Sequence, residues 1–212
     1  MKRIVTDVKK LSDICEGIDT RKQNELMREI ILALKERIEK DNLPALSAPQ
    51  LGYKYRLFCI NFNGKMKTFI NPIISQVDGF DLSREKCCSI PGKEFIRPRN
   101  TKVTVIYQTP LGKAESTQLL GMAARVFQEQ MDHLDGLLLS DIGLELPQNF
   151  DQLSDDEKEK LITDYMKALD IQQKEIEKEI KEDKVLNDLQ NALEFTEGVK
   201  TGKIKIERDE KK

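Results

Sequence analysis

Two segments of this chain repeat their apolar residues at helical spacing. Over residues 20–40 the repeating apolar positions are Leu26, Ile30, Ile31, Leu34 and Ile38. Over residues 121–134 they are Ala124, Phe127 and Met131. Apolar residues that recur every three or four positions form one stripe along a helix. The pattern therefore predicts two amphipathic helices, each with one face packed in a core.

Between the two predicted helices, apolar and polar residues alternate in a way that is typical of strands. Residues 56–62 and 66–74 flank a short turn and predict a first hairpin. Residues 101–119 predict a second hairpin around the turn at 110–112. Residues 41–53 contain two prolines and a glycine and predict a loop. This order predicts an α+β domain in which a helix packs on a mostly antiparallel sheet.

The composition changes near Pro147, after which charged residues dominate. Ser154 is followed by Glu157 three residues later, which is a capping box and predicts the start of a helix. The apolar stripe expected on this helix consists of Leu161, Ile162, Tyr165 and Leu169. Over residues 170–184 only Ile171, Ile176 and Ile180 remain apolar, and the stripe resumes at Val185, Leu186, Leu189 and Leu193. We expect a domain over 1–147 and a charged C-terminal helical extension over 148–212, which is either solvated or part of a coiled coil.

Composition narrows the class of protein. The net charge of −2 gives no electrostatic basis for binding nucleic acid, so no nucleic-acid partner is expected. No apolar run approaches the roughly 18 residues of a membrane span, and the N-terminal residues lack the apolar core of a signal peptide. The cysteines, at Cys15, Cys59, Cys87 and Cys88, form no disulfide framework. These features predict a soluble, cytoplasmic protein in a reducing compartment.

The segment "FQEQMDHLDG" at 127–136 is the strongest candidate for chemistry. It is similar to the metalloprotease pattern H-E-x-x-H, with Glu129 in place of the first histidine and Gln130 in place of the glutamate. Glu129 and His133 are four residues apart and share one face of the predicted helix, and both types of side chain bind zinc or iron. A carboxamide such as Gln130 takes no proton from water near neutral pH. Taken alone, the Glu129–His133 pair also fits a simple surface contact on a charged helix.

Two other segments carry reactive or polar side chains in predicted loops. In "EKCCSIPG", at 85–92, Cys87 or Cys88 could supply a thiolate ligand, although buried free cysteines are commonly inert. In "LSAPQLG", at 46–52, Gln50 could direct an amide donor at a carbonyl oxygen, or could simply be the polar tip of a turn. With a single histidine, the chain by itself offers no site with two histidine ligands.

These three segments, in this order, resemble the motifs of the peptide deformylases, metal hydrolases that remove the formyl group from nascent protein N-termini. The family motifs G-x-G-L-A-A-P-Q, E-G-C-L-S and H-E-x-D-H are matched here by "LPALSAPQ", "EKCCS" and "EQMDH". The resemblance extends over about residues 20–142, including the predicted strands. It implies a deformylase-like α+β fold, with mostly antiparallel sheets packed around a central metal-motif helix.

The resemblance implies a metal site made of Cys87, Glu129 and His133. Cys87 and His133 match the family's cysteine and second histidine, whereas Glu129 replaces the first histidine with another residue that can coordinate metal. Gln50 matches the glutamine that helps to hold the formyl oxygen. Cys88 matches the residue whose backbone amide helps there, and a backbone donor survives a change of side chain. Gln130 falls on the catalytic glutamate and cannot act as a base.

Other positions depart from the family pattern as well. Leu43, Ala45 and Lys86 stand where the motifs have glycine, a residue that permits close backbone approach. Leu43 and Lys86 are therefore expected to place bulk and charge near the substrate. Together with the changes at Glu129 and Gln130, these departures favour a pseudoenzyme, a deformylase-like protein that is catalytically inactive and acts as a binding or structural subunit.

Each hypothesis implies different partners and cofactors. For the pseudoenzyme no cofactor is expected, with zinc or iron at low occupancy as the alternative. Its C-terminal helices would bind a protein partner or a second copy, as part of a large assembly such as a ribosome or a phage particle. A second hypothesis is a working metal hydrolase with a Cys87, Glu129 and His133 site, slowed because an anionic ligand makes the metal's water less acidic. A third is a binder of peptide N-termini that does not turn them over.

Overall fold

The computed structural model describes residues 2–175. By its internal contacts the chain divides into two units, residues 1–150 and 151–212, which are described separately below. The helices are α1 (Val8–Leu11), α2 (Asn24–Asp41), α3 (Met122–Leu134) and α4 (Leu139–Ile142), with the short 3-10 helices η1 (Ala48–Leu51) and η2 (Phe150–Gln152). The strands are β1 (Ala45–Ser47), β2 (Leu57–Phe62), β3 (Lys65–Asp78), β4 (Asp81–Glu85), β5 (Phe95–Arg99), β6 (Lys102–Gln108), β7 (Ala114–Leu120) and β8 (Leu144–Glu145).

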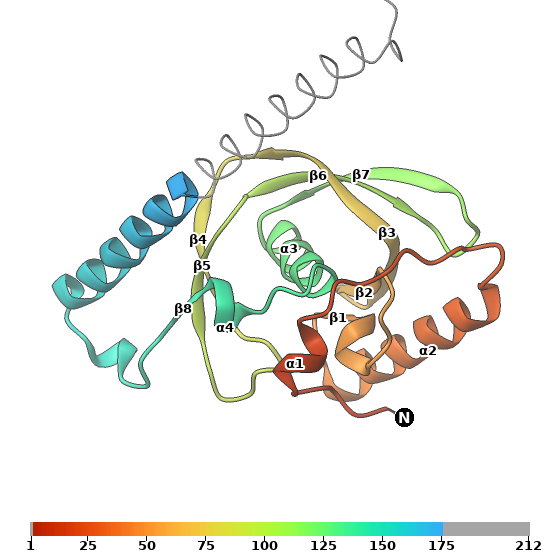
Figure 1. The fold of residues 1–212 in the computed structure, drawn as a ribbon, viewed down its shortest axis with the longest axis horizontal. Coiled ribbons are helices and arrows are strands. Elements are labelled where there is room, and N and C mark those ends of the chain that lie inside the picture. Colours follow the sequence, from red (N-terminus) through yellow and green to blue (C-terminus); the bar gives the residue numbers. More distant parts are fainter. Residues whose placement is uncertain (1, 176–212) are drawn as a thin grey trace, which may run out of the picture. The chain divides into compact units, whose positions relative to one another are not determined.

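Two antiparallel sheets surround α3 in the first unit (Figure 1). The five-stranded sheet has the order β1-β2-β3-β6-β7, and the three-stranded sheet has the order β4-β5-β8. The chain passes from the first sheet to the second at Gly79, whose φ of 59° is a conformation that glycine adopts easily. Both hairpins predicted from the alternation of residues are confirmed, since β2 pairs with β3 and β6 pairs with β7.

The apolar face of α3 packs on an aromatic cluster of the five-stranded sheet. Phe127 is fully buried, and its ring lies edge-on to Phe58 and Phe69 at centroid distances of 5.0 and 5.1 Å. Tyr107 extends the cluster at 4.7 Å from Phe69. Edge-to-face contacts of this kind add to the stabilisation from burial alone. The predicted stripe on this helix is confirmed, and its packing fixes how α3 is rotated.

Replacing Phe127 by alanine should lower the free energy of unfolding by about 3–5 kcal/mol, because it leaves a cavity under α3. Chemical denaturation monitored by circular dichroism measures this. Met122 on the same helix is 70% exposed, so the Met122→Ala control should change the free energy by less than about 0.5 kcal/mol. Equal losses for the two variants would show that the aromatic cluster does not anchor the helix.

The first predicted helix begins later than the sequence pattern indicated. α2 starts at Asn24 rather than at residue 20, because the Asp19 carboxylate accepts hydrogen bonds from the backbone amides of Arg21 and Lys22 and forms a separate turn. The helix ends at Asp41, and the next residue, Asn42, caps it in a left-handed conformation with a φ of 51°. The predicted apolar face is confirmed, and it packs against β1 and β2.

The segment 41–53 is not the simple loop that its prolines and glycine indicated. Residues 45–47 form β1, which pairs with β2, and residues 48–51 form η1. Gln50 Oε1 accepts hydrogen bonds from Ser47 N and Ser47 Oγ at 2.9 and 3.0 Å, and the Gln50 carbonyl accepts one from Val5 N. Strand pairing with a distant segment outweighed the local turn signals here. The result is a rigidly held Gln50 side chain.

The second unit contains a helix that occupies residues 155–175 of the described part. The predicted capping box is confirmed, because the Glu157 carboxylate accepts a hydrogen bond from Ser154 N and Ser154 Oγ accepts one from Glu157 N. The predicted stripe is half-buried at Leu161, Ile162, Tyr165 and Leu169, whereas Ile171 is 58% exposed. The predicted apolar positions from Ile176 to Leu193 lie outside the described residues.

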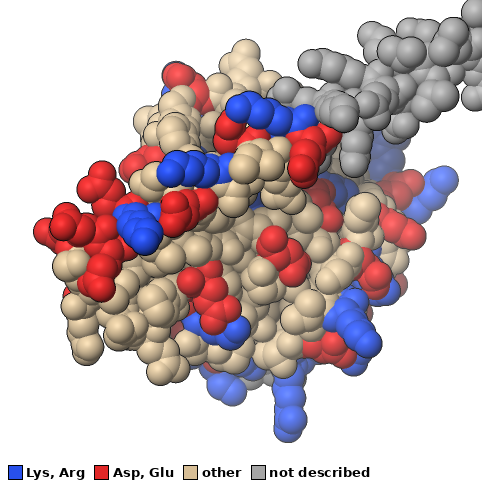
Figure 2. Space-filling view, turned by 60° about the vertical axis from the view of Figure 1, so that its left-hand side comes forward, with Lys and Arg blue, Asp and Glu red and all other residues tan. Residues whose placement is uncertain are grey.

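Side chains of both signs lie on the surface. Figure 2 shows Lys and Arg together with Asp and Glu on one face. Ion pairs among surface charges include Lys86 with Glu94 and Arg125 with Asp81. Within the part of the chain that the structure describes, no helix combines the length and the apolar character needed to cross a lipid bilayer.

Candidate metal site

The three side chains predicted as ligands meet in one place. Cys87 Sγ lies 3.2 Å from His133 Nε2, and Glu129 Oε1 lies 3.2 Å from the same nitrogen. All three potential ligand atoms are within 4.8 Å of one another. Cys87 follows β4, whereas Glu129 and His133 belong to α3, so the two sheets and the helix together assemble the cluster.

Local structure explains how each ligand is presented. Residues four apart lie on the same face of a helix, so Glu129 and His133 project together from α3. Cys87 opens a turn that is closed by a hydrogen bond of 3.0 Å from Ile90 N to the Cys87 carbonyl. His133 and Cys87 are only 2% and 5% exposed. The cluster is thus buried, which excludes the interpretation of Glu129 and His133 as a surface contact.

The electrostatics of the site favour a charged pair on α3. Burial opposes protonation of His133, but the neighbouring Glu129 carboxylate outweighs it and raises the pKa of His133 to about 10. Burial likewise works against the charged form of Glu129, yet His133 keeps the pKa of that carboxyl below its usual range. A hydrogen bond to Cys88, together with burial, raises the pKa of the Cys87 thiol. A metal ion therefore has to displace protons from Cys87 and His133 when it binds.

These residues fit a divalent metal ion. A thiolate, a carboxylate and an imidazole are all accepted ligands of zinc and iron. His133 Nε2 lies 3.2 Å from both Cys87 Sγ and Glu129 Oε1, and all three atoms lie within 4.8 Å of one another, so one ion with bonds of about 2.0–2.3 Å could contact all three. Three protein ligands would leave one coordination position open, as catalytic metal sites do. Cys87, which the family resemblance named as the ligand, lies in the cluster, and Cys88 lies outside it.

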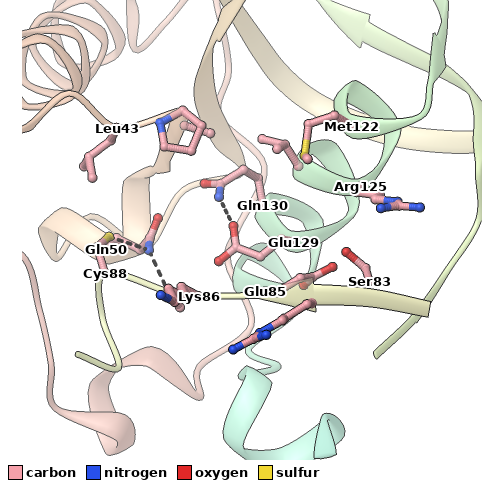
Figure 3. Close-up of a pocket in the computed structure, with 15 residues that line it drawn as sticks. Leu43, Gln50, Ser83, Glu85, Lys86, Cys88, Met122, Arg125, Glu129 and Gln130 are labelled. Carbon is pink, nitrogen blue, oxygen red and sulfur yellow. Dashed lines mark hydrogen bonds between the residues drawn. The ribbon is translucent and has the colours of Figure 1, made fainter. Parts of the chain in front are cut away.

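Gln50 lies beside the two cysteines, with its amide donor directed at sulfur. Its Nε2 is 3.5 Å from Cys87 Sγ, 3.4 Å from Cys88 Sγ and 3.3 Å from Ser89 Oγ. Figure 3 shows the Gln50 amide beside Cys88. An amide hydrogen bond to a ligand sulfur is the kind of outer-shell contact that orients metal ligands. Cys88 is partly exposed and lines the pocket next to the cluster. The predicted roles of Gln50 and Cys88 in holding a carbonyl oxygen stay predictions.

Gln130 is buried, with only 2% of its surface exposed. Its Nε2 donates a hydrogen bond to Glu129 Oε2, and Figure 3 shows the two side chains pointing toward one another. Its Oε1 is buried and has no hydrogen-bond partner among the described residues. The Glu129 carboxylate is therefore held on one oxygen by His133 and on the other by Gln130.

A pocket of about 210 Å³ opens next to the cluster, with Glu129 and Gln130 in its wall. The other residues that line it include Leu43, Ala45, Lys86, Met122 and Arg125 (Figure 3). Leu43 and Lys86, which were expected near the substrate, line the pocket, and so does Ala45, the third residue that replaces a motif glycine. The ammonium group of Lys86 pairs with Glu94 and its side chain is 72% exposed, so its charge is already partnered at the rim.

Met122 and Arg125 at the rim of the pocket were not identified from the sequence. Both belong to the first turns of α3, where no pattern distinguishes them from other surface residues of a helix. Arg125 pairs with Asp81 at the start of β4, at 2.7 Å. No sequence signal could have found them, because they line the pocket only where residues of α3 face those of β4 and the turn after it.

Comparisons with known proteins agree with the fold. The sequence model of the family described as "Polypeptide deformylase" matches residues 1–145. The peptide deformylases of Dictyoglomus turgidum and Dictyoglomus thermophilum are 29% identical over 145 residues and 33% identical over 140 residues. These alignments cover 67% and 66% of this chain, and 95% and 86% of the relatives. The crystal structure of peptide deformylase from Thermotoga maritima matches with a TM-score of 0.62 and 29% identity, covering 67% of this chain and 95% of that one. The α+β fold class is confirmed, and the chain belongs to the peptide deformylase family.

Proposed function

We propose that this protein holds a divalent metal ion at Cys87, Glu129 and His133 but hydrolyses formyl peptides far more slowly than an ordinary deformylase, or not at all. Its role would then be binding rather than turnover. When bound, the ion would supply Lewis-acid chemistry, which polarises a carbonyl group and makes a water molecule more acidic. The observation that carries this proposal is that the carboxylates lining the pocket are already held by hydrogen bonds and ion pairs.

No carboxylate of the described pocket lining is free to act as a general base. Glu129 is held by His133 and Gln130, and Glu85 accepts two hydrogen bonds from Arg99, at 2.8 and 2.7 Å. The remaining candidate position carries the carboxamide of Gln130, which takes no proton near neutral pH. A positioned general base contributes about 10²–10⁴-fold to a reaction rate, so its loss accounts for a large deficit.

A working deformylase is the second candidate, and membership of the family favours it. Glu129 remains a carboxylate at the place where a metal ion would bind, and His133 keeps the pKa of that carboxyl low. Glu129 could then serve as a third ligand, or as a base if the ion is held mainly by Cys87 and His133. In either arrangement one group has to replace both a histidine and a glutamate of the family motif.

Elemental analysis of protein purified without chelator, with a formyl-Met peptide assay on the same sample, tests the proposal. We expect about one metal ion per chain. We also expect turnover at least about 100-fold below that of an active deformylase measured in parallel, such as the Thermotoga maritima enzyme. Turnover at the rate of that enzyme would overturn the proposal in favour of the second candidate. Protein without metal, even after incubation with zinc, would refute metal binding.

A further inference from the structure

Arg99 is a buried arginine that contacts two carboxylates from different parts of the fold. It is the last residue of β5 and is only 3% exposed. Its Nε and Nη2 donate to the two oxygens of Glu85, at 2.8 and 2.7 Å. Its Nη1 donates to Asp132 Oδ2 at 2.6 Å. The guanidinium group therefore joins β4 to α3 through short hydrogen bonds with charged partners.

Both carboxylates belong to residues that lie within three positions of a candidate metal ligand in the sequence. Glu85 is the last residue of β4, two positions before Cys87. Asp132 is on α3, immediately before His133 and three residues after Glu129. The contact from Arg99 thus connects the segment that carries the thiol with the helix that carries the other two ligands. Arg125 also joins β4 to α3, but at the far end of the strand, where Asp81 is largely exposed.

The contact of Arg99 with its two carboxylates fixes their relative positions more than it adds to the free energy of unfolding. Burying an arginine with two carboxylates costs desolvation free energy that offsets much of the attraction, so the net gain in stability is small. The planar guanidinium, in contrast, imposes a fixed geometry on carboxylates that bind it through two parallel hydrogen bonds. Arg97 adds a second, longer contact to Asp132 at 3.4 Å. A network of this kind sets the distance between β4 and α3.

We propose that Arg99 is a positioning residue for metal binding, which holds Cys87 at the correct distance from Glu129 and His133. This inference rests on the metal binding proposed above. A metal site needs its ligands within about 0.5 Å of the productive geometry. Without the bidentate contact, the segment that follows β4 is free to shift relative to α3. Loss of outer-shell partners typically lowers metal affinity by about 10–100-fold, and we expect Arg99 to fall in that range.

The Arg99→Lys variant of the full chain tests this inference. Lysine keeps the positive charge but cannot bind both oxygens of Glu85 and also reach Asp132. The dissociation constant for zinc, measured by competition with a chelator, should rise by about 10–100-fold. Cobalt(II) titration should show a weaker thiolate charge-transfer band, which reports the distance between Cys87 and the ion. Both measurements are made well below the unfolding midpoint, on protein whose circular dichroism matches that of the wild type.

Arg56→Lys is the matched control. Arg56 also binds a carboxylate at α3, donating from Nη1 to Asp135 Oδ1 at 2.6 Å, but that contact lies at the C-terminal end of the helix and does not involve β4. We expect Arg56→Lys to leave the zinc affinity and the cobalt spectrum unchanged. Equal losses in the two variants would show that any loosening of α3 weakens the site, and would overturn the positioning role.

A second substitution keeps the test decisive if Arg99→Lys does not fold. Asp132→Asn preserves the shape of the side chain and leaves the contact between Arg99 and Glu85 intact, so a smaller rise in the zinc dissociation constant is expected. Wild-type affinity in either folded variant would overturn the inference. Failure of the wild-type protein itself to bind zinc would instead refute the proposed function, so the two failures are distinguishable.

Discussion

The double substitution Glu129→His and Gln130→Glu should raise the rate of formyl-Met peptide hydrolysis by about 10²–10⁴-fold. It restores the helix motif H-E-x-D-H at the two positions where this chain departs from that motif, on a helix that already holds His133 in place. Position 130 lies in the pocket wall beside the metal cluster, where a carboxylate would be within reach of a water molecule there. The measurement is kcat/KM with a formyl-Met peptide on zinc-loaded or iron-loaded protein.

The single substitutions serve as controls for this gain. Gln130→Glu alone would place a second carboxylate against Glu129 Oε2, which Gln130 now contacts. Two carboxylates at such a distance share a proton, so one is neutral and the gain should be smaller. Glu129→His alone leaves the site without a base and should remain slow. A wild-type rate equal to that of the double variant would mean that Gln130 does not limit catalysis, which would contradict the proposed function.

Replacing Cys87 by alanine should lower zinc affinity by more than about 100-fold, beyond the usual effect of an outer-shell change. Cys87 is the ligand contributed from outside α3, and the two that remain come from a single helix. Without the thiolate, only the Glu129 carboxylate and the His133 imidazole would bind the ion. The affinity should then be close to that of a carboxylate and histidine pair on a protein surface. Chelator competition measures the affinity, and the cobalt(II) charge-transfer band should disappear.

Cys88→Ala is a closely matched control, because it removes the neighbouring thiol that contacts the same Gln50 amide. Its sulfur is not part of the ligand cluster, so the cobalt band should stay close to that of the wild type and the zinc affinity should not fall. The reverse result, a loss in Cys88→Ala and none in Cys87→Ala, would show that Cys88 supplies the thiolate ligand and would require a different arrangement of the turn after β4.

Local periodicity was sufficient to predict much of this fold. The stripe through Ala124, Phe127 and Met131 predicted α3 and its buried face, because helical geometry alone brings residues three or four positions apart onto one side. The same rule placed Glu129 and His133 together on one face of that helix. Alternation predicted both hairpins, and the capping box at Ser154 predicted where a later helix begins.

Two elements differ from the sequence pattern for different reasons. β1 formed in a segment rich in turn residues because it pairs with β2, and helical or turn periodicity carries no information about such a partner. α2 began late for a local reason, because the Asp19 carboxylate accepts hydrogen bonds from the backbone amides of Arg21 and Lys22 and forms a separate turn before the helix.

The candidate site divides in the same way between sequence and structure. Its residue types and the helical pair were readable from the sequence, together with the substitution at Gln130. The residues alone left Cys87 and Cys88 open, the family resemblance named Cys87, and in the structure the turn after β4 places the Cys87 sulfur with the pair. The direction of the Gln50 donor was decided by the contacts of Gln50 with Ser47. The contact of Arg99 with Glu85 and Asp132 appears only once β4, β5 and α3 have packed together, because burial and hydrogen bonding between separate elements are properties of the assembled fold.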